Sequence, residues 1–531
     1  MVINRYNRRI RIGFVSRLFS IALLLASASA GAAELNTFTM RLSQEPETLD
    51  WNRAHTPIET NLLVNLMEGL VSFDEKLKPV PQLAESWKIS PDGLTYTFHL
   101  RAGVLWSDSV PLRAQDFVAS WKRLLSPATA APYAYLLYDI VGAEEYGSGK
   151  LKDFSQVGIS APDDHTFVVK LKKPVAHWID IPTFWVTFPV REDVVAKYGL
   201  QWESPGRMVT LGPFILTAHD VENRIVMRAN PLYWAKRGNV DQVVGLIVKD
   251  DATAVSLYES GKIDFVTDLD TVNLSRLAGN PELKTFPYLK TAYLGFVPHQ
   301  YPSSNLKFRR AVAMAIDKSQ FGRILHGNQT PATSFVPPGL AAYSQTLGLP
   351  FDPVRAKQEL QESGLADGRT ISFDAVLASG DQMLTLMQYV QAQLKTHLGI
   401  QANLEPFDNK TFRAQLELAS YPMFLLSWSA DYPDPDNFLS LWLGESGNNR
   451  TRWKNSQYDD LVLAARYAKN SKEREKYDIA AQKILLEQEA VIVPLYYEPI
   501  IALVKKRVQA LEMNPLNYMF LKKVNLVVSH P

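Results

Sequence analysis

The chain has 531 residues, a formal net charge of +1 and no cysteine. That length is enough for two or three domains with a large interior. The nearly neutral charge argues against a nucleic-acid-binding protein, which usually carries a basic excess. Without cysteine the chain can form no disulfide and can carry no lipid on a thiol. A large hydrophobic core must therefore provide its stability.

The first 33 residues, 1–33, have the pattern of a secretory signal peptide. Five arginines at positions 5–17 precede an apolar run from Phe19 to Ala26. Small residues at 28–33 then offer cleavage sites. The apolar run is too short to span a bilayer, and no later run reaches about 18 residues. We expect an exported, periplasmic protein with no lipid anchor and no membrane insertion after cleavage.

The rest of the chain alternates between strand and helix patterns. Strands are predicted at 35–42, 95–100, 166–171, 371–377 and 400–406, and helices at 60–70, 114–125, 356–363 and 382–397. The helix at 60–70 is expected to stop at Gly69, and Pro91-Asp92-Gly93 predicts a tight turn before the second strand. Such alternation is typical of α/β architecture.

A single acid at the end of an apolar run is the most informative local feature. Residues 423–426 have the pattern of a buried strand, and Asp431 follows between Trp428 and Tyr432. No Lys or Arg lies in residues 427–449. An acid beside aromatic side chains is costly to desolvate unless a cation meets it. Either a ligand ammonium group supplies that cation, or Asp431 only caps the following turn.

Several short motifs occur in a characteristic order along the chain. They are LAESW at 83–87, DGLTYTF at 92–98, WSD at 106–108, NPLYW at 230–234, FRRAVAMAIDK at 308–318 and VIVPLYY at 491–497. In this order they resemble the peptide/nickel class (family 5) of periplasmic solute-binding proteins of ABC importers. Residues 131–150, 287–296 and 427–439 are most similar to the oligopeptide-binding and murein-peptide-binding members. Ser109 departs from the family, which usually has Gly after the WSD motif.

The resemblance implies an α/β fold of three domains in two lobes. The lobes would close on a ligand like a clamshell, with two hinge crossovers at 285–297 and 498–503. Domain I would comprise residues 34–67, 193–289 and 498–531, domain II residues 68–192, and domain III residues 290–497.

The resemblance also implies a set of ligand-binding residues. Asp431 would hold the α-amino group of a peptide, with Trp428 and Ser429 beside it. Aromatic positions near the cleft of relatives match Tyr133, Tyr135, Tyr288, Tyr293 and Tyr496, each of which suits a core position equally well. His55 and Pro57 match an extended segment that pairs with the peptide backbone, although a proline cannot donate a hydrogen bond there.

One departure concerns the other end of the ligand. Oligopeptide-binding relatives have arginines shortly before the acidic segment, which help to bind the peptide carboxylate. Leu416 and Leu425 occupy those places here, and only Arg413 is basic in residues 413–428. Arg450 and Arg452 lie downstream and are more typical of solvated surface charges. The ligand carboxylate is therefore bound in another way, or the ligand lacks one.

The chain shows no motif of a known catalytic or metal centre. HExxH, GxSxG, CxxC and GxGxxG are all absent. We therefore expect a monomeric binding protein without metal or cofactor, and the resemblance implies a small peptide and an inner-membrane ABC permease as its partners. The alternatives are a binder of a non-peptide solute (a metal chelate, haem or an amine-bearing compound) and a hydrolase that pairs Asp431 with Asp434 or Asp436.

Overall fold

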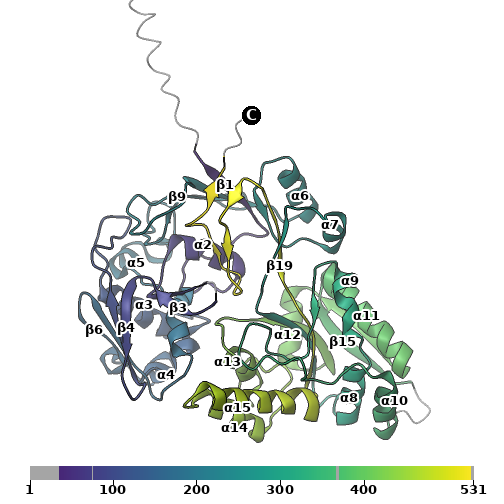
Figure 1. Cartoon of the computed structure of the whole chain (residues 1–531). Coiled ribbons are helices and arrows are strands. Elements are labelled where there is room, and N and C mark those ends of the chain that lie inside the picture. The colour runs from purple at the N-terminus through teal and green to yellow at the C-terminus, as the bar shows by residue number, and fades with distance from the viewer. Residues whose placement is uncertain (1–34, 75, 366–369, 528–531) are drawn as a thin grey trace, which may run out of the picture.

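The computed structural model describes residues 35–74, 76–365 and 370–527. The signal peptide expected at residues 1–33 lies outside this range. Three sheets organise the described chain into two lobes, as Figure 1 shows. We call the units around these sheets domains I, II and III, while their exact boundaries stay a prediction. Within the described ranges, no helix combines the length and apolarity needed to cross a membrane.

Domain I is built on a seven-stranded sheet in which distant parts of the chain meet. Its order is β12-β19-β11-β1-β10-β9-β8. The strands are β1 Thr37–Leu42, β8 Phe214–Asp220, β9 Arg224–Ala229, β10 Gln242–Ile247, β11 Phe265–Val266, β12 Leu283–Phe286 and β19 Ile500–Val504. Parallel pairing of β1 with β10 and β11 occupies its centre, and β19 pairs antiparallel with β11 and β12. The C-terminal part of the chain thus closes the sheet begun at the N-terminus.

Domain II contains a four-stranded antiparallel sheet of order β4-β5-β7-β6. Its strands are β4 Ala84–Ile89, β5 Thr95–Leu100, β6 Ile159–Asp163 and β7 Thr166–Lys170, and helix α3 Ala114–Leu125 contacts β6 and β7. The domain is tied to domain I by buried hydrogen bonds, such as that from Trp51 Nε1 to the Phe188 carbonyl at 3.1 Å. Asn52 likewise donates to the Val186 carbonyl at 2.7 Å. Domains I and II therefore form one lobe.

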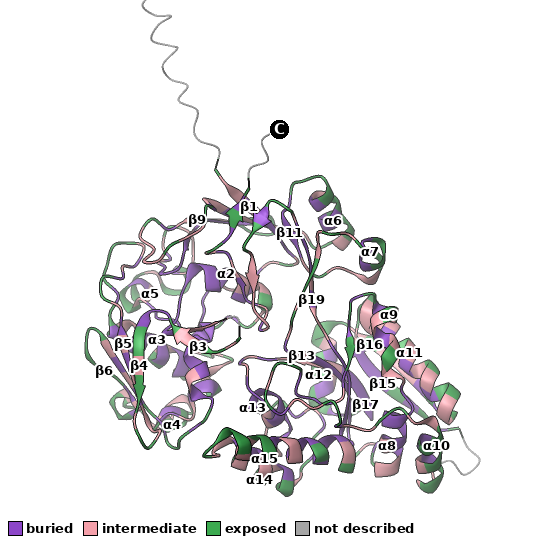
Figure 2. Cartoon of the chain, in the orientation of Figure 1, coloured by how far each residue is buried: buried purple, intermediate pink, exposed green. Residues whose placement is uncertain are grey.

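Domain III forms the second lobe around a six-stranded sheet of order β14-β18-β13-β17-β15-β16. The strands are β13 Lys290–Phe296, β14 Thr330–Pro331, β15 Ser372–Ala378, β16 Gln401–Phe407, β17 Met423–Ser429 and β18 Ile492–Tyr497. Figure 2 shows buried residues concentrated on the central strands and exposed residues on the outward faces of α10, α11 and α15. The predicted α/β fold in two lobes is confirmed.

The remaining elements connect and cover these sheets. The other helices are α2 Pro57–Leu66, α4 Ala143–Gly147, α5 Glu192–Tyr198, α6 Asp251–Glu259, α7 Thr271–Arg276, α8 Leu306–Met314, α9 Phe321–Leu325, α10 Pro353–Glu362, α11 Asp381–Leu398, α12 Asn409–Leu418, α13 Asp436–Leu439, α14 Ser456–Arg466 and α15 Ser471–Lys483. Short strand pairs are β2 Val71–Phe73 with β3 Pro79–Pro81, β20 Val508–Gln509 with β23 Asn525–Leu526, and β21 Glu512–Met513 with β22 Met519–Phe520.

Two chain segments cross between the lobes, and they lie side by side. One joins β12 to β13 and the other joins β18 to β19, which runs down from domain I in Figure 1. At the crossing the backbone N–H of Glu498 donates to the Lys290 carbonyl at 3.2 Å. Their side chains also form an ion pair at 2.8 Å. A hinge needs only a few such residues to absorb a rotation of one lobe against the other.

Candidate functional site

Asp431 lies just beyond the end of β17, in the turn that leads to α13. The side chain of Asn437 fixes this turn, because its Oδ1 accepts from the Asp431 backbone N–H at 3.1 Å. The same oxygen accepts from Trp428 Nε1 at 2.9 Å. One buried amide therefore sets the positions of both the acid and the neighbouring indole.

In the part of the chain that the structure describes, no positive side chain lies close enough to neutralise the Asp431 carboxylate. Among the described residues it has no Lys, Arg or His partner within 4 Å, and the Tyr133 hydroxyl donates only a long hydrogen bond to it, 3.4 Å from Oδ1. Burial raises the pKa of Asp431 to about 7, and the Asn437 and Tyr133 side chains oppose that rise only in part. This is the arrangement that the sequence predicts if a cation comes from outside the chain.

Aromatic side chains from all three domains surround this acid. Tyr133 of domain II lies 5.0 Å from Phe184 and 5.7 Å from Trp185, measured between ring centroids. Trp185 in turn lies 5.9 Å from Tyr518, which belongs to the C-terminal part of the chain. Burial and the Asp431 charge raise the pKa values of both Tyr133 and Tyr518. Sequence reasoning missed Tyr518, because no motif surrounds it.

A cavity of about 810 Å³ opens between domains I and III beside this cluster. Its wall includes Ser43 and Asp268 from domain I, Asp381 from domain III, and Tyr288, Lys290 and Glu498 from the crossovers. Asp431 is not part of the wall. Tyr518 lies between two residues of the wall, Asn517 and Met519, and its ring centroid is 5.9 Å from that of Trp185 in the aromatic cluster.

The other predicted site residues divide into two groups. Tyr288 lies in the cavity wall, Ser429 pairs with Lys290 across β17 and β13, and Tyr135 is 44% exposed beside Tyr133. Tyr293 and Tyr496 are not brought to the cavity. Tyr293 is 2% exposed and packs against Phe335, Phe424 and Trp442, while Tyr496 is fully buried against Phe321. Their aromatic patterns reflect packing in the core of domain III.

His55 and Pro57 lie at the N-terminus of α2, where Pro57 is part of the cavity wall, and their role in ligand binding stays a prediction. Pro57 is the first residue of α2, and Thr56 caps the helix in a capping box with Glu59. The backbone N–H groups of His55 and Thr56 both donate to the Glu59 carboxylate, at 2.7 and 2.9 Å. These two N–H groups are therefore already used within the chain.

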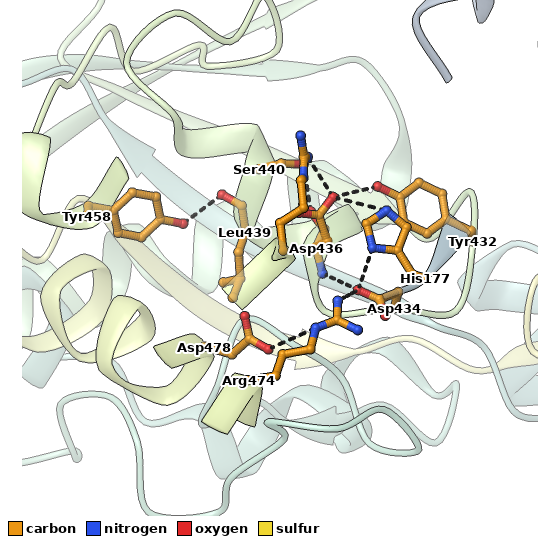
Figure 3. A network of polar contacts seen from close by, with 10 residues as sticks. His177, Tyr432, Asp434, Asp436, Leu439, Ser440, Tyr458, Arg474 and Asp478 are labelled. Carbon is orange, nitrogen blue, oxygen red and sulfur yellow. Dashed lines mark hydrogen bonds and ion pairs between the residues drawn. The ribbon is translucent and has the colours of Figure 1, made fainter. Parts of the chain in front are cut away.

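The two later acids of the segment, Asp434 and Asp436, have internal partners (Figure 3). Asp436 receives two hydrogen bonds from Arg466, at 2.9 and 2.8 Å, and Asp434 pairs with Arg474. His177 of domain II stacks on Tyr432 with ring centroids 5.1 Å apart. Its two ring nitrogens lie 3.8 Å from Asp434 and 3.7 Å from Asp436. Since their arginine partners hold both carboxylates, neither acid is free to work with Asp431.

Two lobes joined by paired crossovers, with a cavity between them, define a solute-binding protein. The sequence profile described as bacterial extracellular solute-binding proteins, family 5 Middle, matches residues 78–450. The chain belongs to this family, as its resemblance predicts.

Three similar proteins are binding proteins by name, and two of these names place the protein in the periplasm. The probable deoxycholate-binding periplasmic protein YgiS of Escherichia coli is 31% identical over 528 residues, which cover 96% of this chain and 97% of that protein. The periplasmic oligopeptide-binding protein OppA of Salmonella typhimurium is also 31% identical and covers 95% of this chain and 97% of its own length. The structure of the Escherichia coli murein tripeptide binding protein MppA matches with a TM-score of 0.81 at 28% identity, over 94% of this chain and 99% of that one.

Proposed function

We propose that this chain is the periplasmic binding component of an ABC-type peptide importer and that Asp431 binds the α-amino group of the enclosed peptide. The observation that carries the proposal is a carboxylate that has no cation partner among the described residues and lies where the domains meet. An ammonium group is the natural partner, because a charge-assisted hydrogen bond contributes roughly 1.5–3 kcal/mol. Trp428, Ser429, Tyr133, Tyr135 and Tyr288 would surround the first ligand residues.

The relatives support a role in transport rather than catalysis. OppA and MppA are named for binding oligopeptides and murein tripeptides. On this proposal the chain is exported by its signal peptide and remains in the periplasm without a lipid anchor. It works as a monomer, closes on one ligand and delivers it to an inner-membrane ABC permease. Closure would use the crossovers at Lys290 and Glu498, at the predicted boundaries of domain III.

The test is the substitution Asp431→Asn, which keeps the shape of the side chain and removes its charge. Tripeptides retained from a mixed-sequence pool are identified by native mass spectrometry, and the dominant one is titrated by calorimetry. We expect about a hundredfold weaker binding to the variant, which corresponds to roughly 2.7 kcal/mol. The N-acetylated peptide, which has no ammonium group, should bind the wild-type protein equally weakly. Equal affinity of both proteins for the free-amine peptide would contradict the proposal.

A non-peptide solute is the second candidate, favoured by the similarity to the deoxycholate-binding relative. Leu416 and Leu425 support it as well, since both are buried and supply no charge for a peptide carboxylate. Competition distinguishes the two candidates. If the chain binds deoxycholate in place of peptide, Asp431→Asn should strengthen the binding of this anion, because it removes a like charge near the site.

A further inference from the structure

We infer that the ligand of this cavity carries a free amine but no free carboxylate, so that the protein selects peptide amides over ordinary free-acid peptides. The inference rests on the proposed function and deepens it by naming the class of ligand. The reason is charge: in the described part of the chain, every positive side chain of the cavity wall has a negative partner, and some negative side chains have no positive partner within 4 Å.

The basic side chains of the cavity wall are all paired. Among the described residues these are Arg41, Lys249 and Lys290. Arg41 is held by Asp251 at 2.5 Å, and its side chain is 1% exposed. Lys249 pairs with Glu222 at 2.6 Å and Lys290 with Glu498 at 2.8 Å. A ligand carboxylate would have to break one of these pairs in order to gain a cation.

Each helix N-terminus at the cavity has an acid of the chain in or beside its first turn, and at α2, α6 and α7 that acid also accepts backbone N–H groups. Helices α2, α6, α7 and α11 begin at its wall, and the partial positive charge of a helix N-terminus attracts anions. Asp250 and Asp270 accept backbone N–H groups at the starts of α6 and α7. Glu59 and Asp381 lie in the first turns of α2 and α11. Each N-terminus therefore already has an acid from the chain.

Asp268 gives the cavity an excess of negative charge. Its carboxylate accepts a hydrogen bond from the Ser43 hydroxyl at 3.2 Å and, among the described residues, has no basic side chain within 4 Å. Asp381 adds a second acid from the opposite lobe, also without a basic partner in the described chain. A carboxylate brought between them would meet like charges, which costs binding energy.

The segment before Asp431 supplies no compensating cation. Leu416 and Leu425 are 5% and 2% exposed, so both side chains belong to the core. Arg450 and Arg452 both contact Glu417 on α12, and Arg413 is exposed on the same helix. The structure therefore offers a partner for the ammonium end of a peptide and none for its carboxylate end.

The experiment uses two tripeptide pools of identical mixed sequence, one with free carboxylates and one with C-terminal amides. Both are equilibrated at equal concentration with the full mature chain, and the retained peptides are measured by native mass spectrometry. We expect the amides to be enriched about tenfold, a ratio equivalent to roughly 1.4 kcal/mol. Equal retention, or enrichment of the acids, would overturn the inference and leave the proposed function intact. Retention of neither pool would overturn both.

Substitutions of Asp268 test the physical cause. Asp268→Lys places a cation in the cavity and should shift the amide preference toward free acids by about tenfold or more. Asp268 has a positive φ of 58°, which Asn tolerates well, so Asp268→Asn is the milder variant and should reduce the preference a few fold. Asp460→Lys makes the same charge change at an exposed position of α14 and should leave the ratio unchanged. An unaltered ratio in both Asp268 variants would refute the inference.

Discussion

Asp431 and Asp436 belong to one short segment, yet their carboxylates have opposite surroundings. Asp436 accepts two hydrogen bonds from Arg466 and one from the Tyr432 hydroxyl at 2.9 Å. Burial alone would raise the pKa of Asp436, but Arg466 and His177 hold it well below its usual range. Asp431 has no such partner, and burial raises its pKa to about 7. Within the described chain, Asp436 thus has basic partners and Asp431 has none, which is the contrast on which the proposed ligand role of Asp431 rests.

The largest effect is expected from Asp436→Asn. It leaves the partly buried Arg466 guanidinium without its buried partner, and breaking a buried ion pair in this way costs about 3–5 kcal/mol. The free energy of unfolding, measured by urea denaturation at pH 7, should fall by this amount. The double variant Asp436→Asn with Arg466→Met should recover part of the loss, because it removes the unpaired charge as well. A loss below about 1 kcal/mol in the single variant would show that the pair is solvated.

Asp431→Asn should raise, not lower, the free energy of unfolding of the ligand-free protein. The pKa of Asp431 is about 7 in the folded chain and 3.8 for an ordinary aspartate, so between these values the folded state binds more protons. Wild-type stability should therefore fall as pH rises from about 4 to about 7. The variant lacks this dependence and should be more stable at pH 8, by on the order of 4 kcal/mol, with no difference near pH 3.

Denaturation of both proteins across this pH range, without ligand, measures the difference. Asp436→Asn is the matched comparison, because a carboxylate with a lowered pKa stabilises the folded state above about pH 4 and loses this effect as pH falls. If the two variants changed stability in the same direction at pH 8, the proposed contrast between the acids would be wrong.

Sequence patterns predicted this contrast only in part. The lone acid after β17 was visible because no Lys or Arg lies in residues 427–449. The partners of Asp434 and Asp436 were not visible, since Arg466 and Arg474 come from α14 and the start of α15, beyond that window. Only the folded chain brings these side chains together.

Helix boundaries and aromatic roles show the same limit. The helix predicted at 60–70 runs from Pro57 to Leu66, and the capping box of Thr56 and Glu59 that starts it is present in the sequence. The roles of Tyr293 and Tyr518 could not be told from sequence, because both suit a core as well as a cleft. Local chemistry fixes the ends of helices, whereas the face that a tyrosine presents depends on how the domains pack.

A substitution of Asn437 tests whether the turn positions Asp431, the acid proposed to bind the ligand. Asn437→Ala removes the acceptor shared by Trp428 Nε1 and the Asp431 backbone N–H. Leaving two donors without a partner costs roughly 1–3 kcal/mol. We expect about tenfold weaker peptide binding by calorimetry, together with altered Trp428 fluorescence. Asn437→Asp retains an acceptor and introduces a charge, so it should keep the indole hydrogen bond and lose affinity for a different reason. Unchanged fluorescence in the alanine variant would argue against the positioning role.

The smallest effect is expected from His177→Gln, although His177 lies at the junction between the lobes. Its nitrogens are 3.8 and 3.7 Å from Asp434 and Asp436, beyond hydrogen-bond length, and its Nδ1 has no other partner among the described residues. Because Arg474 and Arg466 still hold both acids, the unfolding free energy should change by no more than about 1 kcal/mol. The stacking on Tyr432 nevertheless joins domain II to domain III, so its loss should favour the open form. Small-angle X-ray scattering of the ligand-free variant should therefore show a larger radius of gyration than the wild type. A stability loss as large as that of Asp436→Asn would contradict this prediction, because it would show that the two acids depend on His177 as strongly as on their arginines.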